Sequence, residues 1–157
     1  MTLIIEDGTV VAGANSYITV AEFKSWAGDR GIAVGSDTEI EQGILRAMDW
    51  FERHFFIGNK ANENQPLQWP RTEALIDGYY EDATEIPKEV PNALYEATKV
   101  ELDGYSELNE QERKTVREQV GDISITYADN SNNRVVTPAL RFAMNRIARP
   151  AGMVSRE

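Results

Sequence analysis

The chain has 157 residues, 26 acidic and 16 basic side chains, a formal net charge of −10 and no cysteine. Its hydrophobic content of 41% fits one globular domain that is large enough to bury a core. Without cysteine, a disulfide framework and a thiolate metal site are excluded, which fits a reducing compartment. We find no signal-peptide pattern and no apolar stretch long enough to span a bilayer, so we expect a cytosolic protein without membrane contact.

The charge is unevenly distributed along the chain. Residues 134–157 contain five arginines and one acid, so the other residues together carry −14. Twelve acids lie between Glu73 and Glu112, against two lysines. An acidic body should repel a phosphate backbone. The C-terminal segment is therefore the part of the chain whose charge could attract an acidic partner. The alternative is that this charge run is simply a solvated face.

Four helices are expected. The first begins at Thr19, where Glu22 completes a capping box, and ends near Gly28 or Gly31; the others cover residues 37–56, 87–103 and 137–149. Each begins at a residue suited to a helix N-terminus: Thr19, Asp37, Pro87, and Thr137 followed by proline. The central helix is the most one-sided, because its apolar residues fall within an arc of about 100°. This predicted stripe comprises Ile40, Ile44, Ala47, Met48, Phe51 and Phe55.

The remaining segments are expected to be extended or looped. Residues 3–5 predict a short strand before a turn, and residues 72–85 predict a loop that contains a turn at Asp77-Gly78. The alternation after Val120 predicts a β-hairpin near 116–127, in which residues 117–120 pair across Gly121-Asp122. We therefore expect a mainly α fold, a small bundle of about four helices with a β-hairpin and a short N-terminal extended segment. It would form a single domain over 1–149 with a C-terminal tail at 150–157.

No catalytic motif is present, so we expect no enzymatic activity, no cofactor and no metal. His54, the single histidine, is expected to pack rather than to catalyse. Residues 129–134 fail as a calcium loop, because Arg134 stands where the turn glycine is required. A less favoured alternative is a metal-dependent enzyme that uses Asp77, Glu81, Asp82 and Glu85, which we otherwise interpret as a solvated acidic loop.

Two groups of residues are candidates for contacts with partners. An aromatic among arginines can stack a base and bind phosphates, or it can dock on an acidic protein, which the acidity of the chain favours. This candidate portal or partner interface comprises Arg141, Phe142, Arg146, Arg149, Met153 and Arg156. The second group is Trp69 and Arg71, which either anchor a neighbouring subunit or, in the structural alternative, pack beside the central helix.

Four blocks of the sequence, in order, carry a family resemblance. They are residues 5–17 before the helix at Thr19, the Leu-x-Trp-Pro-Arg of residues 67–71, Ile86-Pro87, and the Val-Gly-x-Ile-x-x-x-Tyr of residues 120–127. Together they resemble a family of small tailed-phage and prophage proteins, whose members are often labelled DnaT-like single-stranded-DNA-binding proteins.

The layout is also similar to that of head–tail connector (adaptor) proteins of tailed phages, helical proteins with a β-hairpin that form a ring beneath the portal. The resemblance implies a structural adaptor in the virion neck, assembled in the bacterial cytoplasm. Its partners would be the portal protein, a tail or tail-completion protein and further copies of itself, usually twelve, around passing double-stranded DNA. The alternative is a single-stranded-DNA-binding replication accessory acting through Phe142 and its arginines. The lack of a basic stripe along the body favours the adaptor.

Overall fold

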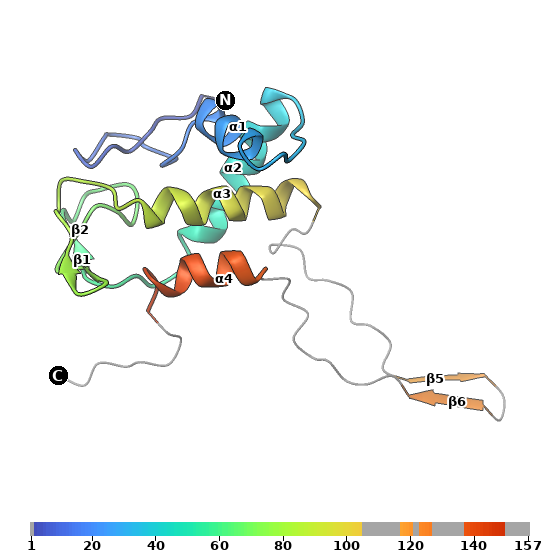
Figure 1. Cartoon of the computed structure of the whole chain (residues 1–157). Helices are drawn as coiled ribbons and strands as arrows, with labels where there is room; N and C mark the ends of the chain where they lie inside the picture. The colour runs from blue at the N-terminus through green and yellow to red at the C-terminus, as the bar shows by residue number, and fades with distance from the viewer. Residues whose placement is uncertain (1, 105–116, 121–122, 127–136, 150–157) are drawn as a thin grey trace, which may run out of the picture.

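The computed structural model describes residues 2–104, 117–120, 123–126 and 137–149 (Figure 1). The helices are α1 (Val20–Gly28), α2 (Asp37–Phe51), α3 (Glu89–Leu102) and α4 (Pro138–Asn145). Short strands form three antiparallel pairs: β1 (Asn59–Lys60) with β2 (Arg71–Thr72), β3 (Leu75–Ile76) with β4 (Tyr79–Tyr80), and β5 (Arg117–Val120) with β6 (Ile123–Thr126).

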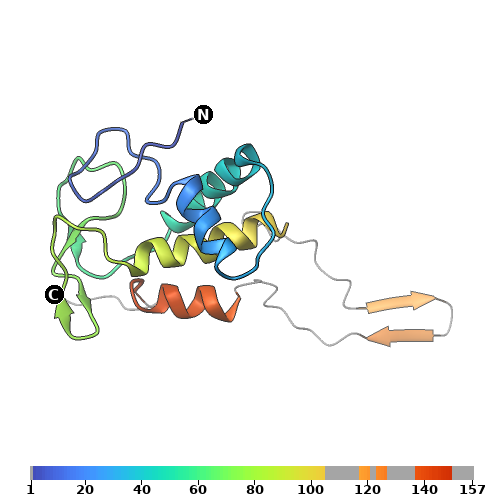
Figure 2. The ribbon, with the colours of Figure 1, turned by 45° about the horizontal axis from the view of Figure 1, so that its top comes forward.

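The helices enclose one core. Figures 1 and 2 show α3 and α4 lying side by side, while α1 and α2 run across α3. Burial of large apolar side chains in this core is the main favourable term in folding and contributes about 1.5–3 kcal/mol of stability for each side chain. The largest fully buried side chains include Phe23, Ile40, Ile44, Phe51, Phe56, Trp69, Leu94, Leu140 and Ile147.

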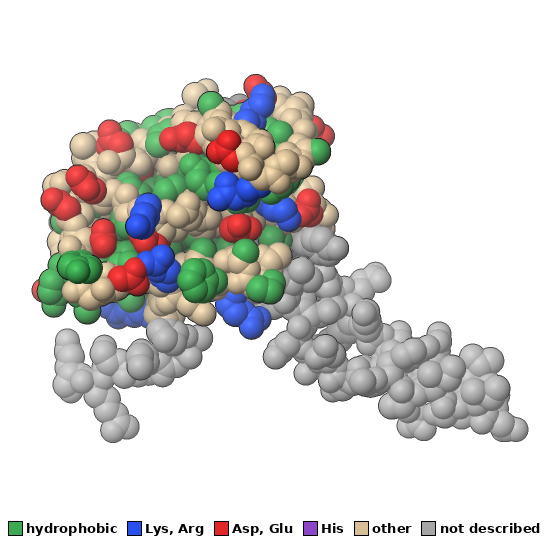
Figure 3. Space-filling view, viewed as in Figure 1, with side chains coloured by type: hydrophobic (Ala, Val, Ile, Leu, Met, Phe, Trp, Pro, Cys, Tyr) green, Lys and Arg blue, Asp and Glu red, His purple; other side chains and the backbone are tan. Residues whose placement is uncertain are grey.

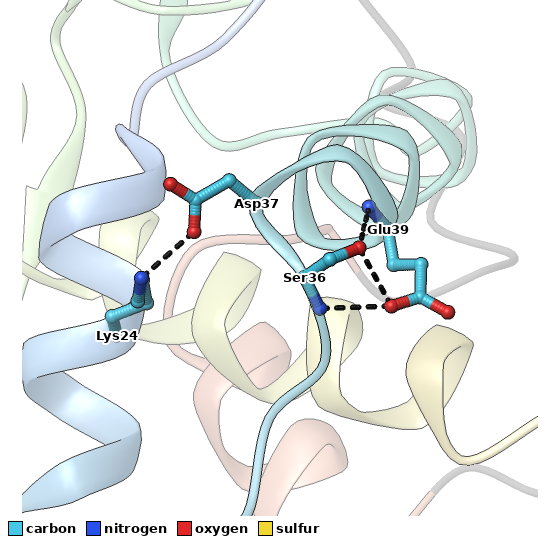
Figure 4. A network of polar contacts seen from close by, with 4 residues as sticks. All are labelled: Lys24, Ser36, Asp37 and Glu39. Atoms are coloured by element: carbon cyan, nitrogen blue, oxygen red, sulfur yellow. Dashed lines mark hydrogen bonds and ion pairs between the residues drawn. The ribbon is translucent and has the colours of Figure 1, made fainter.

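The start of α2 is fixed by a capping box one residue earlier than the sequence predicts. The Ser36 hydroxyl accepts the amide N–H of Glu39, and the Glu39 carboxylate accepts the amide N–H of Ser36 (Figure 4). Asp37 instead pairs with Lys24 of α1 at 2.7 Å. The equivalent box of α1, between Thr19 and Glu22, is confirmed. Reciprocal side-chain caps therefore set where both N-terminal helices begin.

The other end of α2 differs from the prediction. The helix ends at Phe51, and the chain turns through 52–54, so Phe55 leaves the apolar stripe and is 82% exposed. Phe56 enters the core in its place, with its ring centroid 4.7 Å from that of Phe51. The expected helix to residue 56 is therefore wrong, although the buried stripe up to Phe51 is confirmed.

The segment from residue 72 to 85 is not a plain loop. Leu75–Ile76 and Tyr79–Tyr80 pair as a β-hairpin around Asp77 and Gly78, whose φ values are +52° and +89°. Positive φ at both central residues is the turn that matches the twist of a hairpin. The predicted turn at Asp77-Gly78 is confirmed, and the predicted loop around it is wrong.

The N-terminal segment makes no strand among the described residues. Ile5 and Ser16 form one isolated parallel bridge. The buried Glu6 carboxylate accepts the amide N–H groups of Gly8, Val10 and Val11, which folds the chain back on itself. A local side-chain acceptor thus takes the place of the short strand that is predicted at residues 3–5.

The expectation of a small bundle of about four helices with one β-hairpin is wrong. The described chain has four helices, but two of them cross α3, and it has two hairpins together with the β1–β2 pair. The reason is that the non-helical stretch 52–88 fills one end of the core, so the helices need not run parallel. Its buried apolar residues are Phe56, Leu67, Trp69, Ala74 and Ile76. The predicted pairing of Val120 with Ile123 is confirmed, and the tail predicted at 150–157 lies outside the described residues.

Candidate nucleic-acid interface

Two segments that are far apart in the sequence lie side by side at the end of α4. The amide N–H of Arg149 donates to the Phe55 carbonyl at 2.7 Å, and the amide N–H of Ile57 donates to the Ile147 carbonyl at 3.0 Å. Phe56 and Ala148 form an antiparallel bridge between them. The chain after α2 is therefore held against the C-terminal end of α4.

Both of these segments are basic. Residues 53–60 contain Arg53 and Lys60, residues 137–149 contain three arginines, and neither segment contains an acid. We call their exposed basic and aromatic residues the basic face. It comprises Arg53, Phe55, Lys60, Arg141, Phe142 and Arg149. Figure 3 shows Lys and Arg side chains along the lower edge of the body, where α4 lies in Figure 1.

The periodicity of α4 decides which of its side chains face outward. Leu140, Met144 and Ile147 are buried, and Thr137 caps the helix by accepting the amide N–H of Leu140 at 3.2 Å. The opposite side carries exposed residues at helical spacing. An open hollow of about 310 Å³ on this side is lined by Pro138, Arg141, Phe142 and Asn145.

Two phenylalanines are exposed on the basic face. Phe55 is 82% and Phe142 70% exposed, whereas most of the other large aromatic residues near α4, such as Phe56 and Trp69, are buried. An exposed aromatic ring loses the stabilisation of burial, so Phe55 and Phe142 are candidates for contact with a partner. Rings beside exposed cations offer stacking and charge in one place.

The three arginines of residues 137–149 are not equivalent. Arg141 is exposed. Arg149 is exposed and donates one N–H to the Gly58 carbonyl at 3.2 Å. Arg146 instead turns to Asp77 of the β3–β4 hairpin, with which it makes an ion pair, and to the buried Glu89, whose carboxylate lies 3.3 Å away. Arg146 therefore faces the β3–β4 hairpin and Glu89, whereas Arg141 and Arg149 are exposed, and its part in a partner interface stays a prediction. Met153 and Arg156 lie outside the described residues.

Trp69 and Arg71 are held inside the chain. Trp69 is 0% exposed, and its amide N–H donates to the Tyr17 hydroxyl at 2.9 Å. Arg71 is 8% exposed and donates to the carbonyls of Ile57 at 2.7 Å and Gly58 at 2.8 Å. Burial, and secondarily the positive charge of Arg149, lower the pKa of Arg71. This placement is the one that the core-packing alternative predicts, and Arg71 positions the 57–58 backbone under the basic face.

Glu52, at the C-cap of α2, is an acid at the margin of this face. Its carboxylate accepts the Tyr17 hydroxyl at 3.0 Å and the amide N–H of Gln68 at 2.9 Å. Burial raises the pKa of Glu52 to about 7, against the opposing hydrogen bonds and the charges of Lys60 and Arg71. The carboxyl is thus partly protonated near neutral pH, which reduces the negative charge beside the basic residues.

The acids of the hairpin do not gather. Asp77 pairs with Arg146, and the Asp82 carboxylate accepts the amide N–H and the hydroxyl of Thr84. Within residues 2–104, 117–120, 123–126 and 137–149, no group of three or more potential ligands could hold a metal ion. His54 packs against Trp50, with Nδ1 3.1 Å from the Trp50 carbonyl oxygen. The rejected calcium loop at 129–134 lies outside the described residues.

No sequence pattern assigns Arg53, Phe55 and Lys60 to this face. A helix through residue 56 assigns Phe55 to the core and says nothing of contact between residues 53–60 and α4. One signal that could have identified this segment is the absence of acids from residues 53–62. The segment also contains Gly58, a residue suited to a turn. Folding therefore brings two basic segments together, although the sequence shows no basic stripe along the body.

The comparisons with known proteins give one match. A family model described as "Putative DnaT-like ssDNA binding protein" matches residues 1–156. No curated protein and no solved structure matches the chain. Among the described residues, no helix is long and apolar enough to cross a membrane.

Proposed function

Because the chain belongs to the family of DnaT-like single-stranded-DNA-binding proteins, we propose that the basic face binds single-stranded DNA. The observation that carries the proposal is the exposure of two phenylalanines, Phe55 and Phe142, on segments that contain five basic residues and no acid. No chemical step is part of the proposal.

The physical roles divide between rings and cations. Stacking of a base on an aromatic side chain is worth about 1–3 kcal/mol and does not depend on the base. Arg53, Lys60, Arg141 and Arg149 would contact phosphates, so binding should weaken as salt rises. In a duplex the bases are already stacked on each other, so the phenylalanines favour a single strand. The acidic body restricts the strand to this face.

The experiment is a titration of a labelled oligothymidine and of a duplex, followed by fluorescence anisotropy. The variant Arg141→Glu/Arg149→Glu should lose at least about tenfold in affinity for the single strand, because two favourable phosphate contacts become repulsive. Lys24→Glu is the control, since Lys24 is an exposed lysine on α1, remote from α4 (Figure 1). Equal affinities of the double variant and the control would contradict the proposal.

A second candidate is the structural adaptor of the virion neck, and the acidic remainder of the chain favours it. Residues 2–104 contain 19 acids and eight basic residues, which suits the wall of a channel through which DNA must slide without tight binding. The partners would be the portal protein, a tail protein and further copies of the chain. Light scattering with portal rings tests this: stoichiometric capture without oligothymidine binding would favour the adaptor, and binding of the oligonucleotide alone would exclude it.

A further inference from the structure

The β3–β4 hairpin is a second exposed aromatic surface, and its charge is opposite to that of the basic face. Tyr79 is 76%, Tyr80 75% and Leu75 50% exposed. Residues 73–85, which we call the acidic hairpin, contain five acids and no basic residue. Aromatic side chains at this exposure are typical of interface anchors, and the surrounding acids require a basic partner.

The acidic hairpin and the basic face lie next to each other on the same chain. The ion pair between Asp77 and Arg146 joins the hairpin turn to α4. Figures 1 and 2 both show the yellow-green hairpin beside the C-terminal end of α4, and Figure 3 shows hydrophobic side chains on the same lower edge of the body. A surface that is acidic on one side and basic on the other is complementary to itself after a twofold rotation.

We propose that two copies of this chain pair reciprocally, with the acidic hairpin of each copy on the basic face of the other. Each contact would join tyrosines and acids from one copy to phenylalanines and arginines from its partner. The Asp77–Arg146 pair shows within one chain that an acid of the hairpin is a suitable partner for an arginine of α4. The opposite charges would set the register, and the aromatic rings would supply most of the buried apolar area.

The pairing has a consequence for DNA binding, and this consequence rests on the proposed function. A second copy and a single strand would use the same side chains, Phe55, Phe142, Arg141 and Arg149. Binding of one therefore excludes the other at that face. A single strand added to the paired protein should release the partner copy.

The pairing is tested by light scattering on the full chain at low salt, over a range of concentrations. As concentration increases, the apparent mass of the wild type should rise from the 17.6 kDa of one chain towards twice that value. The hairpin variant Glu81→Lys/Glu85→Lys and the face variant Arg141→Glu/Arg149→Glu should each stay at the mass of one chain. An equimolar mixture of the two should regain the doubled mass, because the reversed hairpin then meets a reversed face and the unchanged surfaces also match.

The outcomes separate the pairing from the proposed function. Tyr79→Ser/Tyr80→Ser should reduce pairing while leaving oligothymidine affinity unchanged or higher, since the hairpin is not part of the DNA face. A single-chain mass for the wild type at every concentration, or a doubled mass that survives the hairpin variant, would overturn the pairing. Loss of oligothymidine binding by the face variant would still support the DNA proposal in either case.

Discussion

The basic face and the acidic hairpin expose aromatic side chains to nearly the same degree and differ in charge. Phe55 and Phe142 are 82% and 70% exposed, and Tyr79 and Tyr80 are 76% and 75% exposed. The first pair lies on segments without acids and the second on a segment without basic residues. Under the two proposals above, the exposed rings mark the contact surfaces, and the charge around them selects the partner: phosphate for the basic face, a basic protein surface for the acidic hairpin.

The two regions also differ in how they are built. The acidic hairpin is local, since its turn and both strands lie within residues 75–80. The basic face needs tertiary structure, because residues 53–60 must reach α4, about 90 residues later in the chain. Arg71 and Gly58 make that contact possible: the Gly58 carbonyl accepts hydrogen bonds from both Arg71 and Arg149. The face should therefore be more sensitive to distant substitutions than the hairpin.

The largest effect is expected from Gly58→Ala, which breaks the face. Gly58 has φ +70°, and a Cβ atom there would lie 2.3 Å from the Thr72 carbonyl oxygen and 2.7 Å from the Ala74 nitrogen. The atoms that the added Cβ would meet belong to the backbone and cannot move aside as a flexible side chain can. The free energy of unfolding in urea should therefore fall by about 3 kcal/mol or more. Gly78→Ala is the control: it also has positive φ but nothing within 4 Å, so it should cost about 1–2 kcal/mol. Equal losses would contradict this view of the 58–74 contact.

A pH effect is expected from Glu52. Its pKa is about 7 in the folded protein and 4.5 as the ordinary value, so the folded state binds the proton more tightly than the unfolded state. The contribution of Glu52 to stability is therefore complete below pH 4.5 and is lost as pH rises to 7, by up to about 3 kcal/mol. Glu52→Gln mimics the protonated form, so its free energy of unfolding in urea should rise relative to that of the wild type as pH increases over this range. A constant difference between the two from pH 4.5 to 8 would refute the raised pKa.

The comparison is sharpened by removing single rings. Phe142→Ala and Phe55→Ala should each weaken oligothymidine binding about 5- to 150-fold, the equivalent of about 1–3 kcal/mol of stacking. Tyr79→Ala and Tyr80→Ala are matched controls with similar exposure and should leave the affinity unchanged or higher. Fluorescence anisotropy at fixed salt measures all four. If the tyrosine variants lost as much as the phenylalanine variants, the hairpin would belong to the DNA site.

The smallest effect is expected from Asp77→Asn, which separates the two regions electrostatically. The ion pair with Arg146 is substantially solvent-exposed, with side-chain exposures of 64% and 31%, so its loss should change the free energy of unfolding by less than about 1 kcal/mol. Glu89 still faces Arg146 at 3.3 Å. A loss of several kcal/mol in urea unfolding would instead mean that the hairpin depends on this pair.

The parts of the fold that the sequence predicts correctly depend on neighbouring residues. The capping box at Thr19, the start of α4 at Thr137 and the pairing of Val120 with Ile123 are each set by residues a few positions apart. The predicted end of α2 is wrong because the observed end depends on contacts between distant residues, whereas the β3–β4 hairpin is missed although it is local. Phe56, and not Phe55, enters the core, where its ring packs edge to face against Trp69, 13 residues later in the chain. Asp77-Gly78 is a hairpin signal, but its two-residue strands are too short to show alternation.

The same division holds for the candidate site. Arg141 and Phe142 are predictable because the apolar period of α4 assigns them to the outer side. Arg146 lies on that helix too, yet its partners Asp77 and Glu89 are more than 50 residues away. No local sequence pattern predicts such ion pairs, and none predicts that residues 53–60 contact the C-terminal end of α4. The charge sum of the whole chain is misleading for the same reason, because folding gathers basic residues that the sequence keeps apart.

The central claim is most directly tested by the salt dependence of oligothymidine binding to the wild type. Four exposed cations on the basic face predict that the logarithm of affinity falls with the logarithm of salt with a slope of about −3. Arg141→Glu/Arg149→Glu should make that slope much shallower as well as lowering the affinity. Absence of binding at low salt, or a slope that the double variant leaves unchanged, would contradict a single-strand site on this face.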